Sequence, residues 1–410
     1  MPETSCDTTG LADEIDAASA SVSHSPARAL WIQIALALGG FAIGTGEFAL
    51  MGLMPNVASD LNVTEPQVGH LISAYALGVV VGAPLLAILG ARFFRQHLLI
   101  GLMGFYALGN LASALAPDYD SLMVFRFIAG LPHGAYFGVA ALVAASLVPA
   151  DQRAKAVSRV MVGLTLALLI GNPLATLLGQ YVEWRYAFAF VGLVAVVTLA
   201  SVALFLPVDR TEERQAPLAE VRAFNQPAIW YPLAIGAIGF AGMFCVFSYL
   251  APTLLNVTGV SRNWIPVALL VFGLGGFVGN LLGGWVFDRL GFKGVGWLLA
   301  WAAVTLAVFP STTGNLPLLL GMCFLVSLMV GLGPALQTHL MDVAAGAQTL
   351  AAASHHAAFN TANALGPWLG GVAIGAGFGW DVTGYVGAAT AVAGLVIFTM
   401  AWKSRRTAHP

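Results

Sequence analysis

Charged residues gather in short clusters along this chain, and the apolar runs between the clusters are about as long as a membrane-crossing helix. Seven runs contain no Asp, Glu, Lys or Arg, and each has between 21 and 26 residues. These runs are 66–91, 96–117, 127–150, 160–182, 186–208, 263–287 and 382–402. A helix needs roughly 20 apolar residues to cross about 30 Å of hydrocarbon. Each run therefore predicts one membrane-spanning α-helix.

The remaining apolar stretches predict five further spans. Residues 29–55, 223–261 and 343–380 hold one span each. The stretch 294–341 is long enough for two, and a turn rich in Pro and Gly at 310–317 divides it. The sequence thus predicts an all-α integral membrane protein with 12 transmembrane helices.

Composition supports this fold class and excludes several functions. Hydrophobic residues make up 59% of the chain and charged residues 9%. A net charge of −2 leaves no basic face for a nucleic acid, so we expect no nucleic-acid partner. Cys6, Cys245 and Cys323 lie far apart and show neither a disulfide framework nor metal-ligand spacing. We expect no metal and no cofactor.

Lysine and arginine in the connecting loops predict the orientation. Arg126 lies inside a span, and Arg185 and Arg262 fall on one side of the membrane. The other 14 of the 17 lysines and arginines fall on the opposite side. Positively charged loops remain in the cytoplasm. We therefore expect a multi-pass protein of the cell (inner) membrane with both termini cytoplasmic, present as a monomer in the lipid bilayer.

One charged connection divides the chain into two six-span halves. Residues 207–227 are the predicted cytoplasmic linker between bundles at 29–206 and 228–402. Residues 1–28 are rich in Ser, Ala and Asp and are predicted to be a disordered cytoplasmic tail, with 403–410 as a second tail. Acidic residues precede the first arginine, which is the reverse of a secretory signal.

The two halves carry matching features at similar spacing. The loop after span 2 is similar to the loop after span 8, with an offset of 197 residues from Ala91 to Asp288. Pro173 in span 5 and Pro367 in span 11 are 194 residues apart. Similar offsets indicate a parallel duplication. We expect two pseudo-symmetric six-helix bundles around a central cavity.

Several segments resemble the major facilitator superfamily. The loop GGWVFDRLGFK (283–293) resembles the family's signature loop, and RFIAGLPHGAYFG (126–138) resembles its arginine-bearing span 4. GTGEFALMGLMP (44–55) is similar to the opening of the drug:proton antiporter branch, particularly its arabinose-efflux-permease-like members. The antiporter motif of span 5 is partly present, since Asn172 and Thr176 occupy expected glycine positions. The resemblance covers the whole twelve-span region.

The resemblance also implies gating residues in the two related loops and at the interface between the halves. In the first-half loop, Ala91 replaces the family's acid and Phe94 replaces a glycine, so that Arg92 and Arg95 remain. The second-half loop matches the family pattern at Gly284, Asp288, Arg289, Gly291 and Lys293. The expected kink positions of spans 5 and 11 are Gly171, Pro173, Gly366 and Pro367.

Glu47 and Arg126 place formal charges well inside the predicted spans. A charged side chain at mid-bilayer costs about 2.5–3.5 kcal/mol, so such groups are usually paired, water-facing and functional. At the helical rise per residue, the two lie about 12 Å and about 9 Å below the outer ends of spans 1 and 4. We interpret Glu47 as the proton-accepting acid and Arg126 as the charge that tunes its proton affinity. The alternative is a static ion pair that fixes helix packing.

Further polar and aromatic residues are candidates for the substrate cavity, each with a packing role as the alternative. They are His133, Phe41, Phe48, Phe240, Phe244, Tyr249, Gln337, His339, Asn360 and Asn363. His133 could extend a proton path. Asn360 and Asn363 share a helix face, and such residues more often bond neighbouring helices than substrate. The adjacent His355 and His356 lack the spacing of paired metal ligands.

The features together predict a proton-coupled secondary transporter. We expect efflux of a small organic solute or drug in exchange for protons by alternating access, with sugar or nucleoside transport as the alternative. A non-transporting receptor is the alternative from another class, but it would normally carry a larger output domain. No phosphate-binding loop, nucleophile with a base, or H-E-x-x-H motif occurs in the sequence, so we expect no enzyme.

Overall fold

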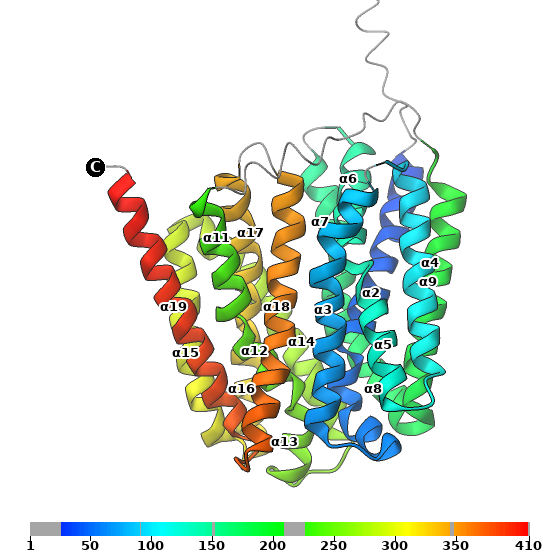
Figure 1. Ribbon diagram of the computed structural model, residues 1–410. Helices are drawn as coiled ribbons and strands as arrows, with labels where there is room; N and C mark the ends of the chain where they lie inside the picture. Colours follow the sequence, from blue (N-terminus) through cyan, green and yellow to red (C-terminus); the bar gives the residue numbers. More distant parts are fainter. Residues whose placement is uncertain (1–25, 91, 150–151, 209–225, 345–347, 409–410) are drawn as a thin grey trace, which may run out of the picture.

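The computed structural model describes residues 26–90, 92–149, 152–208, 226–344 and 348–408. Within these ranges every regular element is a helix. Figure 1 shows the helices as a bundle, with their axes running from one end of the molecule to the other and some helices in front of others. The chain enters α2 and leaves α19 at the same end of the bundle, which we call the terminus end; the opposite end is the far end.

The first half contains six passes. They are α2 (Pro26–Leu61), α3 (Glu65–Gly90), α4 (Arg95–Ala114), α5 (Tyr119–Gly130) with α6 (His133–Ser146), α7 (Arg153–Leu166) with η2 (Ala167–Gly171) and α8 (Asn172–Leu178), and η3 (Gly179–Glu183) with α9 (Trp184–Phe205).

The second half repeats this number. Its passes are α11 (Pro227–Ala234) with η5 (Ile235–Gly239), α12 (Ala241–Ser248) and α13 (Leu250–Asn256), then α14 (Trp264–Leu290), α15 (Phe292–Val308) with η6 (Phe309–Thr312), α16 (Leu316–Ser327) with η7 (Leu328–Gly331) and α17 (Leu332–Val343), α18 (Gln348–Gly375) and α19 (Val382–Ala408).

Hydropathy alone finds ten membrane-crossing stretches among the described residues. One of them, Lys155–Phe205, has 51 residues and contains two passes, because the chain turns back between α8 and α9. α18 is not among the ten, since His and Asn side chains interrupt its apolar sequence. It nevertheless runs the length of the bundle beside α3 (Figure 1). The predicted count of twelve is thereby confirmed.

Local chemistry defines several helix ends. The Asp118 carboxylate accepts a hydrogen bond from the backbone N–H of Ser121 at 2.8 Å and caps α5, and this bond holds the pKa of Asp118 below its usual value. Asn315 caps α16 in the predicted turn, with its Oδ1 accepting from the Leu318 N–H at 3.2 Å. Gly291 ends α14 with φ of +54°, a conformation that favours glycine.

The halves meet through two equivalent helix pairs. α3 of the first half packs along α18 of the second, and α14 of the second half packs against η2 and α8 of the first. Span 2 therefore packs against span 11, and span 8 packs against span 5. This is the arrangement expected if the two halves are related copies. Small residues allow the close approach: a side chain at Gly273 would contact the backbone of Leu168.

The two predicted kink positions differ in structure. A π-helical turn, η2, ends just before Pro173, which has no N–H to donate to the carbonyl four residues earlier. Around Pro367 the α-helix continues without interruption from Gln348 to Gly375. Pro367 likewise leaves the carbonyl of Asn363 without its helical donor, although the helix does not break there.

The division of the chain into two bundles, a linker and two tails stays a prediction. Residues 1–25 and 209–225, which contain most of the predicted tail and linker, lie outside the described residues, as does Ala91. α2 begins at Pro26, before the predicted start of the first span. α19 continues to Ala408, so residues predicted as the second tail extend the last helix.

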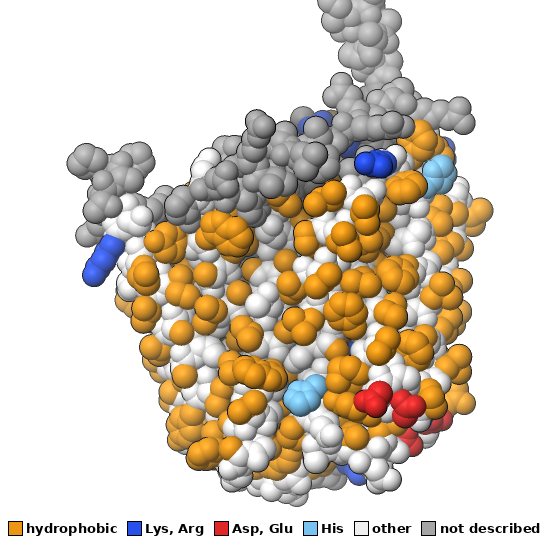
Figure 2. Space-filling model, viewed as in Figure 1, with side chains coloured by type: hydrophobic (Ala, Val, Ile, Leu, Met, Phe, Trp, Pro, Cys, Tyr) orange, Lys and Arg blue, Asp and Glu red, His pale blue; other side chains and the backbone are white. Residues whose placement is uncertain are grey.

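The surface has the polarity of a protein embedded in lipid. Figure 2 shows a broad belt of hydrophobic side chains, with Lys and Arg near the terminus end and Asp and Glu toward the far end. Large apolar side chains such as Leu204 (76% exposed) and Trp297 (69% exposed) point outward. Apolar exposure of this extent indicates contact with the hydrocarbon of a bilayer.

Two adjacent glycines of the loop motif test the packing of the second half. A methyl group at Gly283 would collide with the backbone of Gly331, whereas one at Gly284 would meet no atom within 4 Å. We expect Gly283→Ala to lower the free energy of unfolding by about 1–3 kcal/mol, the usual range for overpacking. Gly284→Ala should leave it unchanged. Thermal unfolding of both variants in detergent micelles measures the difference, and equal midpoints would contradict the described α14–η7 contact.

Candidate functional site

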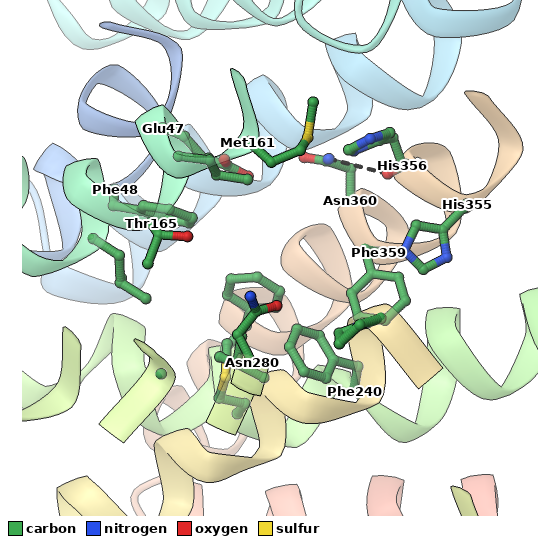
Figure 3. A pocket seen from close by; sticks show the side chains of 18 of the residues that line it. Glu47, Phe48, Met161, Thr165, Phe240, Asn280, His355, His356, Phe359 and Asn360 are labelled. Carbon is green, nitrogen blue, oxygen red and sulfur yellow. Dashed lines mark hydrogen bonds between the residues drawn. The ribbon is translucent and has the colours of Figure 1, made fainter. Parts of the chain in front are cut away.

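A cavity lies between the two halves, and Met161, Gln337 and His355 line it from the parts of α7, α17 and α18 nearer the terminus end. Its walls come from α2, α6, α7 and η2 of the first half and from α12, α14, η7, α17 and α18 of the second, together with Phe240 just before α12. Its polar lining consists of Glu47, His133, Thr165, Asn280, Gln337, His355, His356 and Asn360. Figure 3 shows Glu47 and Thr165 on one side and Phe240, Phe359 and His355 on the other, with Asn280 between them.

Five phenylalanines line the cavity: four from the second half form a wall, and Phe48 faces them from the first half. Phe240 is central, with ring centroids 4.5 Å from Phe359 and 5.4 Å from Phe244. Phe48 of the first half reaches across to Phe247, with centroids 6.0 Å apart. Edge-to-face and offset aromatic contacts of this kind are favourable and leave flat π-surfaces for a ligand.

Glu47 lies on α2 at the boundary between the cavity and the packed interior. Its side chain is 5% exposed, and its Oε1 accepts a hydrogen bond from Asn363 Nδ2 on α18 at 2.8 Å. The bond therefore joins the two halves. A buried carboxyl with a single amide donor and an open side toward a cavity can exchange a proton with that cavity.

Arg126 is fully buried on α5 but does not pair with Glu47 as an ion pair. Its guanidinium carbon lies 4.3 Å from the ring centre of Tyr75 and 5.1 Å from that of Phe188. None of the described residues accepts a hydrogen bond from its three guanidinium nitrogens. Aromatic faces stabilise the cation instead, while its charge remains within electrostatic range of Glu47. Of the two predicted arrangements, the static ion pair is absent.

Two histidines, one from each half, continue the contacts of Arg126 and Tyr75 across the cavity. The Tyr75 hydroxyl lies 3.1 Å from His133 Nδ1, so one ring connects Arg126 to His133. The imidazoles of His133 and His356 belong to different halves and have centroids 6.5 Å apart. His356 also stacks on Phe137 at 5.5 Å with nearly parallel rings.

The halves are sealed to each other on the far side of the cavity. Ser73 Oγ donates to the Ala364 carbonyl at 2.8 Å, and Gln180 Nε2 donates to the Arg262 carbonyl at 3.2 Å. Both bonds cross between the halves. α13 packs against α2 in the same region. The cavity therefore lies on the terminus side of a closed far end.

Comparison with known proteins agrees with this architecture. The family model of the Major Facilitator Superfamily matches residues 36–354. The chain is 37% identical to the inner membrane transport protein YdhP of Escherichia coli (strain K12) over 377 residues, which cover 91% of this chain and 97% of that protein. It is 34% identical to a chloramphenicol resistance protein of Streptomyces lividans, covering 83% of this chain and 88% of that protein.

The chain belongs to the Major Facilitator Superfamily. Among solved structures, it is similar to a bacterial homologue of the human lysosomal transporter Spinster in an inward-facing, unoccupied conformation. The TM-score is 0.71 at 16% identity, covering 92% of this chain and 96% of that one, which supports the fold. The chain is therefore a transporter of this superfamily and not an enzyme.

The superfamily's loop residues lie at the terminus end and mostly at the surface. Arg92, Asp288 and Lys293 are exposed. Arg289 lies over the Trp285 ring at 4.3 Å, and Lys293 lies 5.7 Å from the ring centre of Trp402. Their gating role, with that of Arg95, stays a prediction.

Several sequence candidates lie away from the cavity. Phe41 lies beside Gly171 at the α2–η2 contact. The Tyr249 hydroxyl donates to the Pro367 carbonyl at 2.7 Å, and His339 packs 4.2 Å from the Phe292 ring. A glycine at 366 is required because a side chain there would meet the backbone of α12.

Other lining residues had no distinguishing signal in the sequence. Asn280 is an uncharged residue within a glycine-rich segment of α14. Phe247, Phe359, Met161 and Met243 are apolar residues in apolar spans, and nothing in one sequence separates a cavity face from a buried one. The breaks in apolar periodicity at Asn280, His355 and His356 were the available signals.

Tyr75 tests how Arg126 is held. Tyr75→Leu removes the aromatic face, and we expect the free energy of unfolding to fall by about 1–2 kcal/mol because a desolvated cation–π contact is lost. Tyr75→Phe keeps the face and loses only the hydroxyl near His133. It should keep most of the stability. Thermal midpoints of the purified variants give the comparison, and an equal loss in both would show that the ring does not stabilise Arg126.

Proposed function

We propose that this transporter exports small, amphipathic organic molecules in exchange for protons. The observation that carries the proposal is Glu47, a nearly buried acid that lines the cavity, bonds to the opposite half and lies near a buried arginine. Ionisable groups inside membrane segments mark proton or substrate pathways. No other described Asp or Glu lines this cavity.

The geometry supports an exchange in which Glu47 binds the proton and the cargo in turn. With the cavity on the predicted cytoplasmic side, Glu47 can release its proton there and attract cargo. The halves then rearrange, so that the acid faces the other side, takes up a proton and releases the cargo. Because charged and protonated forms differ in their interaction with Arg126 and Asn363, the proton influences the conformational equilibrium.

The cavity lining supports an amphipathic cargo. The phenylalanine wall suits a planar apolar group, and the polar side chains opposite it can accept or donate hydrogen bonds. Glu47 favours a cation or a hydrogen-bond donor over an anion. The relative from Streptomyces lividans is named for chloramphenicol resistance. Chloramphenicol, an aromatic molecule with several hydrogen-bonding groups, is therefore a reasonable first probe.

Glu47→Gln tests proton coupling. Vesicles of known orientation would carry an imposed pH gradient and a fluorescent pH indicator, and probe would be added. We expect probe-dependent collapse of the gradient with the parent chain and none with Glu47→Gln, because the amide cannot take up a proton. Glu65→Gln, which alters the acid at the first residue of α3, away from the cavity, is the matched control.

The sign of the proton flux separates the two directions of transport. Opposite movement of probe and proton supports export, and parallel movement supports symport. Full gradient collapse by Glu47→Gln would remove the proposed role of this acid.

Phe359→Ala tests the aromatic wall. The ring lies 4.5 Å from Phe240 and faces the cavity, so its removal should weaken binding of an aromatic probe about 3- to 10-fold. Phe277→Ala removes a ring that is 41% exposed on the lipid side of α14 and should have no effect. Equilibrium binding to purified protein measures both. A weakening common to the two variants would indicate general destabilisation.

A further inference from the structure

Residues 363–367 in the middle of α18 make hydrogen bonds to α2, to α3 and to Tyr249, which lies between α12 and α13. Asn363 donates to Glu47 on α2, the Ala364 carbonyl accepts from Ser73 on α3 at 2.8 Å, and the Pro367 carbonyl accepts from Tyr249 at 2.7 Å. The first two bonds cross between the halves and the third lies within the second half. Movement of one half against the other must therefore change the surroundings of this turn.

The same turn is weakened within its own helix. Pro367 cannot donate to the Asn363 carbonyl, so α18 lacks one internal hydrogen bond at the residue that contacts Glu47. Helices bend preferentially where such a bond is missing. Asn363 thus connects Glu47 to a turn of α18 that lacks one backbone hydrogen bond and can therefore bend more easily.

An amide is suited to detecting the charge of a carboxyl group. Asn363 is fully buried, its Nδ2 donates to Glu47 Oε1, and its Oδ1 makes no hydrogen bond among the described residues. A hydrogen bond to a carboxylate is about twice as strong as one to a neutral group. When Glu47 is protonated on its other oxygen, Oε1 still accepts from Asn363 Nδ2, but as a neutral and therefore weaker acceptor.

We propose that Asn363 is the positioning residue that transmits the protonation state of Glu47 to the second half. In the described conformation, ionised Glu47 holds α18 against α2 and keeps the far end closed. A proton or a cargo that binds Glu47 weakens this bond, so that the turn at 363–367 yields and the far end can open or close; unloaded, ionised Glu47 keeps it closed. This inference rests on the proposed function, since it assumes that Glu47 carries the proton.

Other titratable groups surround Glu47 and must be separated from it. Arg126, Tyr75 and Tyr106 face it from its own half. His133, His355 and His356 face the same cavity. All six remain in Glu47→Gln, so any pH response that persists in that variant belongs to them.

The test follows the far-end distance and proton release as functions of pH. Spin labels at Asp120→Cys and Ser311→Cys, at the far ends of the two halves, report opening in the full chain. A Cys6→Ser background suffices, because Cys245 and Cys323 are buried. Proton release on addition of chloramphenicol reports the charge of Glu47.

Asn363→Leu is the decisive variant, since it keeps the size of the side chain and removes the donor. We expect the far end to lose its pH response, and the midpoint of proton release to rise by about one pH unit, the equivalent of a tenfold change in proton affinity. Ser73→Ala removes the neighbouring cross-half bond without touching Glu47. It should change the open fraction at every pH and leave the midpoint unchanged.

The possible outcomes are distinct. An Asn363→Leu protein with the parent's midpoint and pH response overturns the inference while the proposed function stands. Equal midpoint shifts in Asn363→Leu and Ser73→Ala overturn it as well, because any cross-half bond would then suffice. A pH response unchanged in Glu47→Gln would contradict the proposed function itself.

Discussion

The structure depends on placing a carboxyl group inside the membrane together with partners that stabilise its charge. A charged side chain at mid-bilayer costs about 2.5–3.5 kcal/mol, and the chain meets this cost for Glu47 with one amide donor, one nearby cation and a cavity. The amide comes from the opposite half. The interaction that makes the acid tolerable therefore also joins the two bundles.

Most of the fold could be predicted from the sequence because the bilayer imposes a length. Charge-free runs of the required size located seven spans, and the turn at 310–317 separated two more. α18 shows the limit of hydropathy, since its His and Asn residues face protein and a cavity, where polar groups are satisfied. The stretch 343–380, which contains no Asp, Glu, Lys or Arg, predicted this span all the same.

The candidate site was only partly predictable. A charge within a span identifies Glu47 and Arg126, but the partner of each depends on how α3, α9 and α18 pack in three dimensions. Arg126 meets the rings of Tyr75 and Phe188, and Glu47 meets Asn363. Similarly, Phe41 and Phe48 are two turns apart on α2, yet only Phe48 faces the cavity. Both are phenylalanines on nearly the same face of α2, and the difference is their position along the helix axis: Phe41 lies against Gly171 of η2.

The aromatic cradle of Arg126 has a consequence for biogenesis. One face comes from α3, which is synthesised earlier, and the other from α9, which emerges about 60 residues later. Until α9 enters the bilayer, the guanidinium has a single ring beside it and otherwise contacts lipid or the translocation machinery. The first bundle therefore reaches its stable form only when its last helix is inserted, before the ribosome has completed the second bundle.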